Sequence, residues 1–167
     1  MRQVVNPRYT KQKDLYSCAC VSILNAYKFF GHQVSLSSHL PLLKIELGTK
    51  PRQGTSHEAS RDLIPQLFKG RSRYQPRLEE IDTHLEKDYP VLHNVCTYKD
   101  LGHFYLIVGK TAKYYKVVNF FDYRNVPFAL QRISRKKLLK YNRKTYNQIG
   151  SWAYFPTQVK REDLSHG

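Results

Sequence analysis

The sequence "QKDLYSCACVSILNAYKFFG" (residues 12–31) places two cysteines at the start of an apolar run. Apolar residues recur in this run at three- and four-residue intervals, which is the pattern of a helix with one buried face. Ser17 or Asp14 can cap the start of the helix, and Gly31 suits the left-handed position past its end. We therefore predict a helix over about residues 17–30.

In this helix the two cysteines are expected to have different environments. Cys20 falls on the apolar stripe and is expected in the core, whereas Cys18 lies in the first turn. A thiol in the first turn meets the positive end of the helix dipole and N–H groups that lack a partner within the helix. Both favour the thiolate, so we expect Cys18 to have a lowered pKa and to be reactive. The alternative is that both cysteines are buried packing residues.

The composition is that of one globular domain. The chain has 167 residues, of which 41% are hydrophobic and 25% charged, and a chain of this length buries about 70% of its unfolded surface. No apolar run approaches the ~18 residues of a membrane span, and no signal peptide is evident, so we expect a cytoplasmic protein. The three cysteines and seven histidines show no metal-ligand spacing. We expect no metal and no cofactor.

A strong positive charge is the main compositional signal, with 28 Lys and Arg against 13 Asp and Glu, a formal net charge of +15. The densest basic stretch is "RISRKKLLKYNRK" (132–144), which as a helix would turn its leucines inward and its cations to water. The predicted basic surface consists of Arg135, Lys136, Lys137, Lys140, Arg143 and Lys144. It is either an ordinary solvated face or a binding surface for nucleic acid or an acidic protein partner.

Helices are predicted first along the chain and strands afterwards, which indicates the α+β class. Further helices are expected at about residues 40–47, at 55–70 and at 77–88. The second of these begins with "TSHE", where Thr55 and Glu58 have the spacing of a capping box. Pro65 must kink this helix or end it early.

Short segments rich in aromatic and β-branched residues follow from Tyr89 onwards, and they predict strands. They read "YPVLHNV", "HFYLIVG", "YYKVVNFF", "VPFALQRI" and "SWAYFP". No repeat or linker divides the chain, so we expect a single domain over 1–167. Its core should span about residues 8–156, and the basic tail, 157–167, should be loose.

A nucleophilic cysteine needs a base, usually histidine, and a third group that orients the base. His103 opens the strand "HFYLIVG", and a three-residue hairpin loop after this strand would place His103 directly opposite Asn119. Opposed residues have Cβ atoms about 4.5–5.5 Å apart, close enough for the amide oxygen to hold the imidazole. Asp122 is the acidic rival of Asn119, and His93 is the best rival of His103.

An ordered set of motifs carries a resemblance to a known family. The set comprises Gln12 six residues before Cys18, "KFFG" closing the first helix, "GTS" at 54–56, "YPVLHNV", and "GHFYLIV" with Asn119 sixteen residues after His103. In this order and spacing, residues 8–156 resemble the papain-like cysteine peptidases that process double-glycine leader peptides, the bacteriocin-processing family.

The resemblance implies a papain-like fold, with N-terminal helices packed on a C-terminal antiparallel sheet. It implies hydrolysis of a peptide or amide bond through a thioester on Cys18. His103 would move the proton, Asn119 would fix the imidazole, and Gln12 would stabilise the oxyanion together with the backbone N–H of Cys18. The chain is then expected to be a stand-alone cysteine peptidase or amidase acting on a peptide or protein substrate, with acidic substrates favoured by its charge.

Three features depart from the family pattern. Ala19 follows the cysteine where the family has Gly, and Asn119 followed by Phe120 stands where the family has Asp followed by Pro. Members of the family are also fused to transporter membrane domains, which this sequence lacks. Two other functions stay open. One is a papain-like scaffold that binds nucleic acid or an acidic protein, and the other is thiol acyl transfer, such as deamidation or crosslinking of glutamine.

Overall fold

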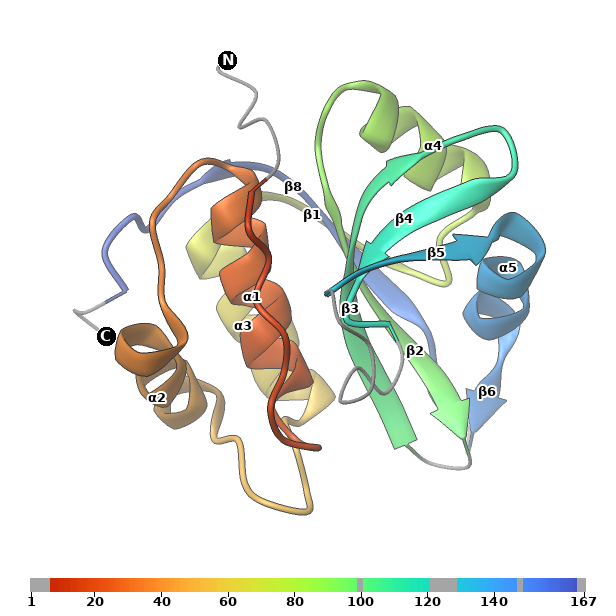
Figure 1. The fold of residues 1–167 in the computed structure, drawn as a ribbon. Helices are drawn as coiled ribbons and strands as arrows, with labels where there is room; N and C mark the ends of the chain where they lie inside the picture. The colour runs from red at the N-terminus through yellow and green to blue at the C-terminus, as the bar shows by residue number, and fades with distance from the viewer. Residues whose placement is uncertain (1–6, 99–100, 121–128, 147–148, 165–167) are drawn as a thin grey trace.

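The fold is built around one antiparallel sheet, as a computed structural model that describes residues 7–98, 101–120, 129–146 and 149–164 shows (Figure 1). The helices are α1 (Cys18–Phe29), α2 (Leu36–Leu47), α3 (His57–Leu67), α4 (Leu78–Glu86) and α5 (Arg135–Arg143). The main strands are β1 (Phe68–Tyr74), β2 (Val91–Tyr98), β3 (Leu101–Lys110), β4 (Tyr114–Val118), β5 (Leu130–Ser134) and β8 (Trp152–Val159). They form a sheet in the order β1-β8-β2-β3-β4-β5, and β6 (Thr145–Tyr146) pairs separately with β7 (Ile149–Gly150).

Helices cover both faces of the sheet, and a hydrophobic cluster fills each interface. Residues of α1, α2 and α3 pack with Leu92, Phe104 and Leu106 in one cluster. Residues of α4 and α5 pack with Tyr105, Ile107 and other residues of the opposite face in the second cluster. Figure 1 shows α1, α2 and α3 together on one side and α4 and α5 on the other. The α+β class and the predicted packing of N-terminal helices on an antiparallel sheet are confirmed.

Helix α1 forms as predicted and begins at Cys18. The Asp14 carboxylate accepts hydrogen bonds from the N–H groups of Tyr16 (3.0 Å) and Ser17 (2.8 Å) and so fixes the turn that leads into it. Gly31 follows its end with φ of 88°, in the left-handed region that favours glycine. The side chain of Cys20 is fully buried, as expected.

Two helix starts differ from the prediction because serines cap them. Ser35 accepts a hydrogen bond from the Ser38 N–H (3.3 Å), so α2 begins at Leu36, four residues earlier than predicted. In α3 the cap is Ser56, which accepts from the Ala59 N–H (3.1 Å), rather than Thr55.

The segment after α3 is a strand rather than more helix, so the predicted extension of the helix to Gly70 is wrong. Strand β1 follows directly from Leu67 and pairs with β8 at the edge of the sheet. A Cβ on Gly70 would lie 2.2 Å from the Phe155 carbonyl oxygen, so this pairing requires glycine. The apolar alternation that reveals a buried strand is missing here, because every residue of β1 after Phe68 is exposed.

The prediction of a loose tail is wrong for the described residues 157–164. Strand β8 continues to Val159, which pairs with Phe68, and the Lys160 N–H donates to the Leu67 carbonyl (2.7 Å). Leu164 is buried in the cluster under α1 and α3. Residues 157–164 therefore pack on the domain.

The predicted register of β3 and β4 is wrong by three residues next to the turn, where Lys110 pairs with Tyr115, and by two residues on the side of His103. Leu106 pairs with Val118, and a bulge interrupts the ladder between Ile107 and Gly109. A shift of two residues keeps every side chain on its own face of the sheet. His103 therefore still reaches the end of β4, although not directly opposite Asn119. The rival Asp122 lies outside the described residues.

A buried polar network joins α5 to the sheet through His93. The Tyr105 hydroxyl lies 2.6 Å from His93 Nδ1, and His93 Nε2 lies 2.9 Å from Asn142 Oδ1. The Asn142 amide nitrogen donates to the Pro76 carbonyl (2.6 Å), which leaves its oxygen as the acceptor. His93 is therefore neutral with its proton on Nε2, and burial lowers its pKa to about 4.

We predict that this histidine makes folding stability depend on pH. In the unfolded chain His93 titrates near its ordinary value of about 6.5, so between about pH 4 and 6.5 the unfolded state binds one proton more than the folded state. The free energy of unfolding should rise with pH across this window, by a few kcal/mol in all. Urea unfolding at several pH values measures this slope. His93→Gln should lower stability at pH 7 but flatten the slope, and an unchanged slope would contradict the assignment.

Candidate active site

The thiol of Cys18 lies against β3 at Phe104. The Phe104 backbone N–H is close enough to the sulfur to favour its thiolate form. One turn along α1, the Ser22 hydroxyl donates to the Phe104 carbonyl (2.9 Å) in a buried hydrogen bond. Both main-chain polar groups of Phe104 therefore face α1, and this fixes the strand beside the first turn of the helix. His103 is the residue directly before Phe104.

The expected lowering of the Cys18 pKa does not occur. Burial raises the pKa of the Cys18 thiol above its usual value and outweighs the N–H groups of Phe104 and Ala19, which act in the opposite direction. The nearby negative charge of Asp14 raises the pKa further. The start of the helix does supply N–H groups, but they lower the pKa of the thiol by less than desolvation of the sulfur raises it.

A main-chain carbonyl holds the imidazole of His103. Its Nε2 hydrogen-bonds to the backbone carbonyl of Asn119. Because a carbonyl oxygen only accepts, Nε2 carries the proton, and the neutral ring has its basic lone pair on Nδ1. Burial lowers the pKa of His103, and the bond to Asn119 acts in the opposite direction. The ring is therefore a neutral base at pH 7.

Asn119 acts in a different way from the one predicted, because its amide oxygen does not hold His103. Asn119 is 1% exposed and adopts a left-handed backbone conformation with φ of 59°. This conformation follows the end of β4 and turns the carbonyl to His103. The side-chain Nδ2 donates to the Thr10 carbonyl (2.9 Å), and Oδ1 has no hydrogen-bond partner among the described residues.

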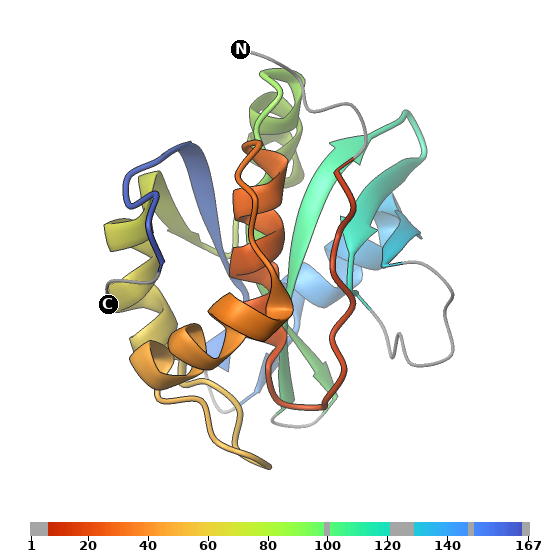
Figure 2. The ribbon, with the colours of Figure 1, turned by 60° about the vertical axis from the view of Figure 1, so that its left-hand side comes forward.

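Thr10 is the point at which the N-terminal segment is clamped. Its N–H donates to Asn25 Oδ1 (2.8 Å), and its carbonyl accepts from Asn25 Nδ2 (3.1 Å) as well as from Asn119. Lys28 Nζ donates to the Arg8 carbonyl (2.9 Å). Figure 2 shows residues 7–17 running beside α1 in the opposite direction. Neither Thr10 nor Asn25 was predicted as a functional residue, although Asn25 in the middle of an apolar helix is a signal that a polar partner exists.

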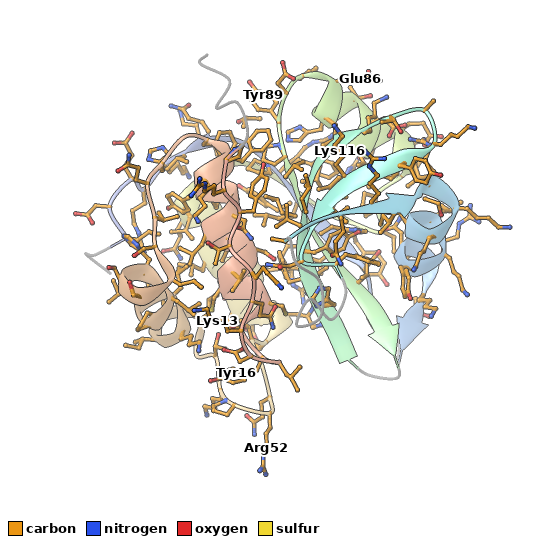
Figure 3. The ribbon with its side chains drawn as sticks, viewed as in Figure 1. Lys13, Tyr16, Arg52, Glu86, Tyr89 and Lys116 are labelled. Atoms are coloured by element: carbon orange, nitrogen blue, oxygen red, sulfur yellow. The ribbon has the colours of Figure 1, made fainter. Side chains whose placement is uncertain are left out.

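Gln12 is buried two residues beyond this clamp and is 3% exposed. Its Nε2 donates to the Asp14 carbonyl (2.7 Å) in the turn before Cys18. Lys13 and Tyr16, labelled in Figure 3, belong to the same turn, below the start of α1. The oxyanion role of Gln12 stays a prediction.

The other histidines of the described chain lie in separate contacts. His57 Nδ1 accepts from the Trp152 indole N–H (3.1 Å), and His84 Nε2 lies 2.8 Å from the Pro156 carbonyl. Both ring nitrogens of His93 have partners in the buried network, and the preference for His103 as the base stays a prediction. No group of three or more possible metal ligands occurs among the described residues.

The residues of the predicted basic surface on α5 differ in their contacts. Arg135 makes a bidentate ion pair with Asp82 (2.9 and 2.7 Å), so its charge is compensated within the fold. Lys144 lies over the Tyr141 ring, 4.8 Å from its centroid. The remaining members are Lys136, Lys137, Lys140 and Arg143, of which Lys137 is half-buried and the others are exposed.

Solved structures with a similar fold are peptidase domains. The peptidase domain of Streptococcus ComA, a bifunctional ABC transporter involved in quorum sensing, aligns with a TM-score of 0.65, over 91% of this chain and 100% of that domain. The chain has a papain-like peptidase fold. The peptidase domain of Streptococcus mutans ComA aligns with a TM-score of 0.51, over 90% of this chain and 98% of that domain.

Both papain-like domains are 17% identical to the chain, so the similarity concerns the fold. They are peptidase domains of the double-glycine leader type that the sequence motifs indicated. No protein-family model and no curated protein matches the chain. Among the helices that the structure describes, none has the length and apolar character needed to cross a membrane.

We predict that the rate of Cys18 alkylation follows the pH dependence of a thiol whose pKa is at or above the usual value. Because the pKa of Cys18 is raised and His103 is neutral, the thiolate is scarce at pH 7. The rate with iodoacetamide should increase steadily above pH 7, with no plateau between pH 5 and 8. Mass spectrometry of the adducts separates Cys18 from Cys20, whose pKa burial raises to about 11. A plateau that His103→Ala removes would show a preformed ion pair and contradict this account.

We also predict that Asn119→Asp loosens the N-terminal segment. A carboxylate cannot donate to the Thr10 carbonyl, and the two oxygens would repel each other, at a cost of about 1–3 kcal/mol. Asn119→Gly is the matched control, because it keeps the left-handed backbone and only removes the donor. Hydrogen exchange of the Thr10 N–H should accelerate more in the Asp variant than in the Gly variant. Equal protection in the wild type and Asn119→Asp would refute the clamp.

Proposed function

We propose that the chain is a cysteine peptidase or amidase with Cys18 as nucleophile and His103 as general base. The observation that carries the proposal is the adjacency at Phe104. Its N–H contacts the Cys18 sulfur, and the preceding residue presents an imidazole whose proton is held on the far nitrogen by the Asn119 carbonyl. A thiol beside a neutral, oriented base is the arrangement that nucleophilic acyl transfer requires. The papain-like fold supports the same reaction class.

The raised pKa of Cys18 and the lowered pKa of His103 favour a neutral pair over a thiolate–imidazolium pair. In the first step His103 Nδ1 takes the thiol proton while the sulfur attacks the carbonyl carbon of the substrate. The C–N bond then breaks, and the leaving amine receives the proton from Nδ1. Water, deprotonated by the same nitrogen, attacks the thioester carbonyl. The C–S bond then breaks, the acid is released, and the Cys18 sulfur takes the proton back from Nδ1.

The tetrahedral intermediate of each step carries a negative oxygen. The Cys18 N–H at the start of α1 and the Gln12 amide are the donors assigned to it. Gln12 is buried, and the clamp at Thr10 and the bond to Asp14 limit the motion of its segment. Donors that are already fixed need no reorganisation when charge develops, and loss of one typically costs about 10²–10³ in turnover.

The test is digestion of a peptide library by the wild-type chain and by matched variants, with new termini identified by mass spectrometry. Cys18→Ala should abolish cleavage, and Gln12→Glu, which keeps the shape but removes the donors, should lower kcat by about 10²–10³ with little change in KM. Cleavage that survives Cys18→Ala would disprove the proposal.

Acyl transfer to an amine would use the same residues up to the thioester. Addition of a small primary amine to the digestion separates the two outcomes, because transfer yields a new amide where hydrolysis yields an acid. The cytoplasmic location and the binding of nucleic acid stay predictions.

A further inference from the structure

The α1-facing side of β4 and β5 carries a group of exposed side chains that the proposed reaction does not use. Tyr115, Val117 and Ile133 point into the cluster under α4 and α5. Tyr114, Lys116, Leu130 and Arg132 alternate with them and therefore project from the other face. Figure 1 shows α1 beside β3 and the strands β4 and β5 extending away from that helix.

Two positive charges lie directly opposite each other on this face. Lys116 pairs with Arg132 in the β4–β5 register, and both are exposed. Directly opposed residues have Cβ atoms about 4.5–5.5 Å apart, and like charges at this spacing destabilise a sheet. Neither side chain has an ion-pair partner among the described residues, in contrast to Arg135 and Lys110, which pair with Asp82 and Glu86. Figure 3 labels Lys116 on β4.

Large apolar side chains flank the two charges. Leu130 is 47% exposed and Tyr114 is 43% exposed. Leu130 pairs with Val118, and Tyr114 pairs with Ser134 at the other end of the ladder. The strand rise of about 3.3 Å per residue places the Lys116–Arg132 pair about 7 Å, and Tyr114 about 13 Å, from the Val118–Leu130 pair.

This row starts at the candidate active site. The Asn119 N–H donates to the Ala129 carbonyl (3.0 Å), next to Leu130, and the Asn119 carbonyl holds His103. A chain that leaves the thiol along β4 and β5 therefore passes Leu130, then the charge pair, then Tyr114.

We propose that this face, defined by Tyr114, Lys116, Leu130 and Arg132, docks an extended acidic segment of the peptide substrate. The inference rests on the proposed function for the identity of the occupant as substrate. One or two carboxylates placed between the opposed cations relieve their repulsion, and apolar residues on either side cover Leu130 and Tyr114. The net charge of +15 speeds the encounter with such a segment.

A nucleic acid fits the face less well. Binding along a phosphate backbone needs cations spaced along the path. Here the positive charge is confined to one cross-strand position, and the positions on either side hold Leu130 and Tyr114. The arrangement matches a peptide with an acidic residue between apolar ones.

The experiment uses the full chain with Cys18→Ala, so that binding is measured without turnover. The probe is a fluorescein-labelled twelve-residue peptide that alternates Leu and Glu, compared with its Gln counterpart and with twelve-residue oligo(dT). Lys116→Gln/Arg132→Gln should weaken binding of the acidic peptide about tenfold. The Gln peptide should bind weakly to every variant, and thermal unfolding should show no loss of stability, because the repulsion is removed.

Two matched double variants separate a local site from overall charge. Lys69→Gln/Lys87→Gln removes the same charge, at the β1 edge of the sheet and at the end of α4, and Lys136→Gln/Lys140→Gln removes it from α5. Both should leave the affinity within about twofold, because they act only through net charge. An equal loss in all three, a larger loss from the α5 variant, or tighter binding of oligo(dT) through Lys116 and Arg132 would overturn the proposal.

The result is independent of catalysis. If the library digestion finds no Cys18-dependent cleavage but the acidic peptide binds through Lys116 and Arg132, the proposed reaction fails and the docking face stands. If cleavage is found and the peptide does not bind there, the docking face fails alone.

Discussion

The contact between α1 and the main chain of Phe104 determines the geometry of the candidate active site. Ser22 satisfies the Phe104 carbonyl, and the Phe104 N–H faces the Cys18 sulfur. An unpaired main-chain group at this buried interface would cost about 1–3 kcal/mol, so strand and helix are fixed to each other at one residue. The proposed base, His103, is the residue directly before Phe104, so this contact fixes its backbone position relative to the start of α1.

Asn119 connects His103 to the N-terminal segment, again through hydrogen bonds of a single residue. Its carbonyl holds His103, while its side-chain amide holds the segment that carries Gln12. This double role gives a physical reason for an amide at a position where the double-glycine peptidase pattern has a carboxylate. Aspartate could accept from an imidazole but could not donate to Thr10.

The sequence predicted the structure best where local residue patterns determine it. Helix α1, the left-handed Gly31 and the buried Cys20 follow from periodicity and capping, and strands β2, β3, β4 and β8 follow from β-branched and aromatic composition. Strand β1 could not be found, because an exposed edge strand has no apolar alternation. The register of β3 and β4 failed at the turn, where Lys110 pairs with Tyr115, three residues from the prediction, and the bulge at Val108 removes only one residue of this error.

The roles of Gln12, Cys18, His103 and Asn119 stay predictions. The group that holds His103 is the Asn119 carbonyl rather than the predicted amide oxygen, and a sequence does not show which main-chain carbonyl a side chain will meet. The pKa of Cys18 was predicted with the wrong sign, because helix position is visible in a sequence and desolvation is not.

The central claim is that a neutral His103, with its proton on Nε2, stands as the base beside Cys18. Nitrogen-15 NMR of the histidine rings measures this state directly. At pH 7 we predict for His103 one protonated nitrogen, Nε2, and one pyridine-type nitrogen, Nδ1, whose resonance shifts when Cys18 is changed to alanine. A doubly protonated ring, the opposite tautomer, or a His103 spectrum that does not respond to Cys18→Ala would contradict the account.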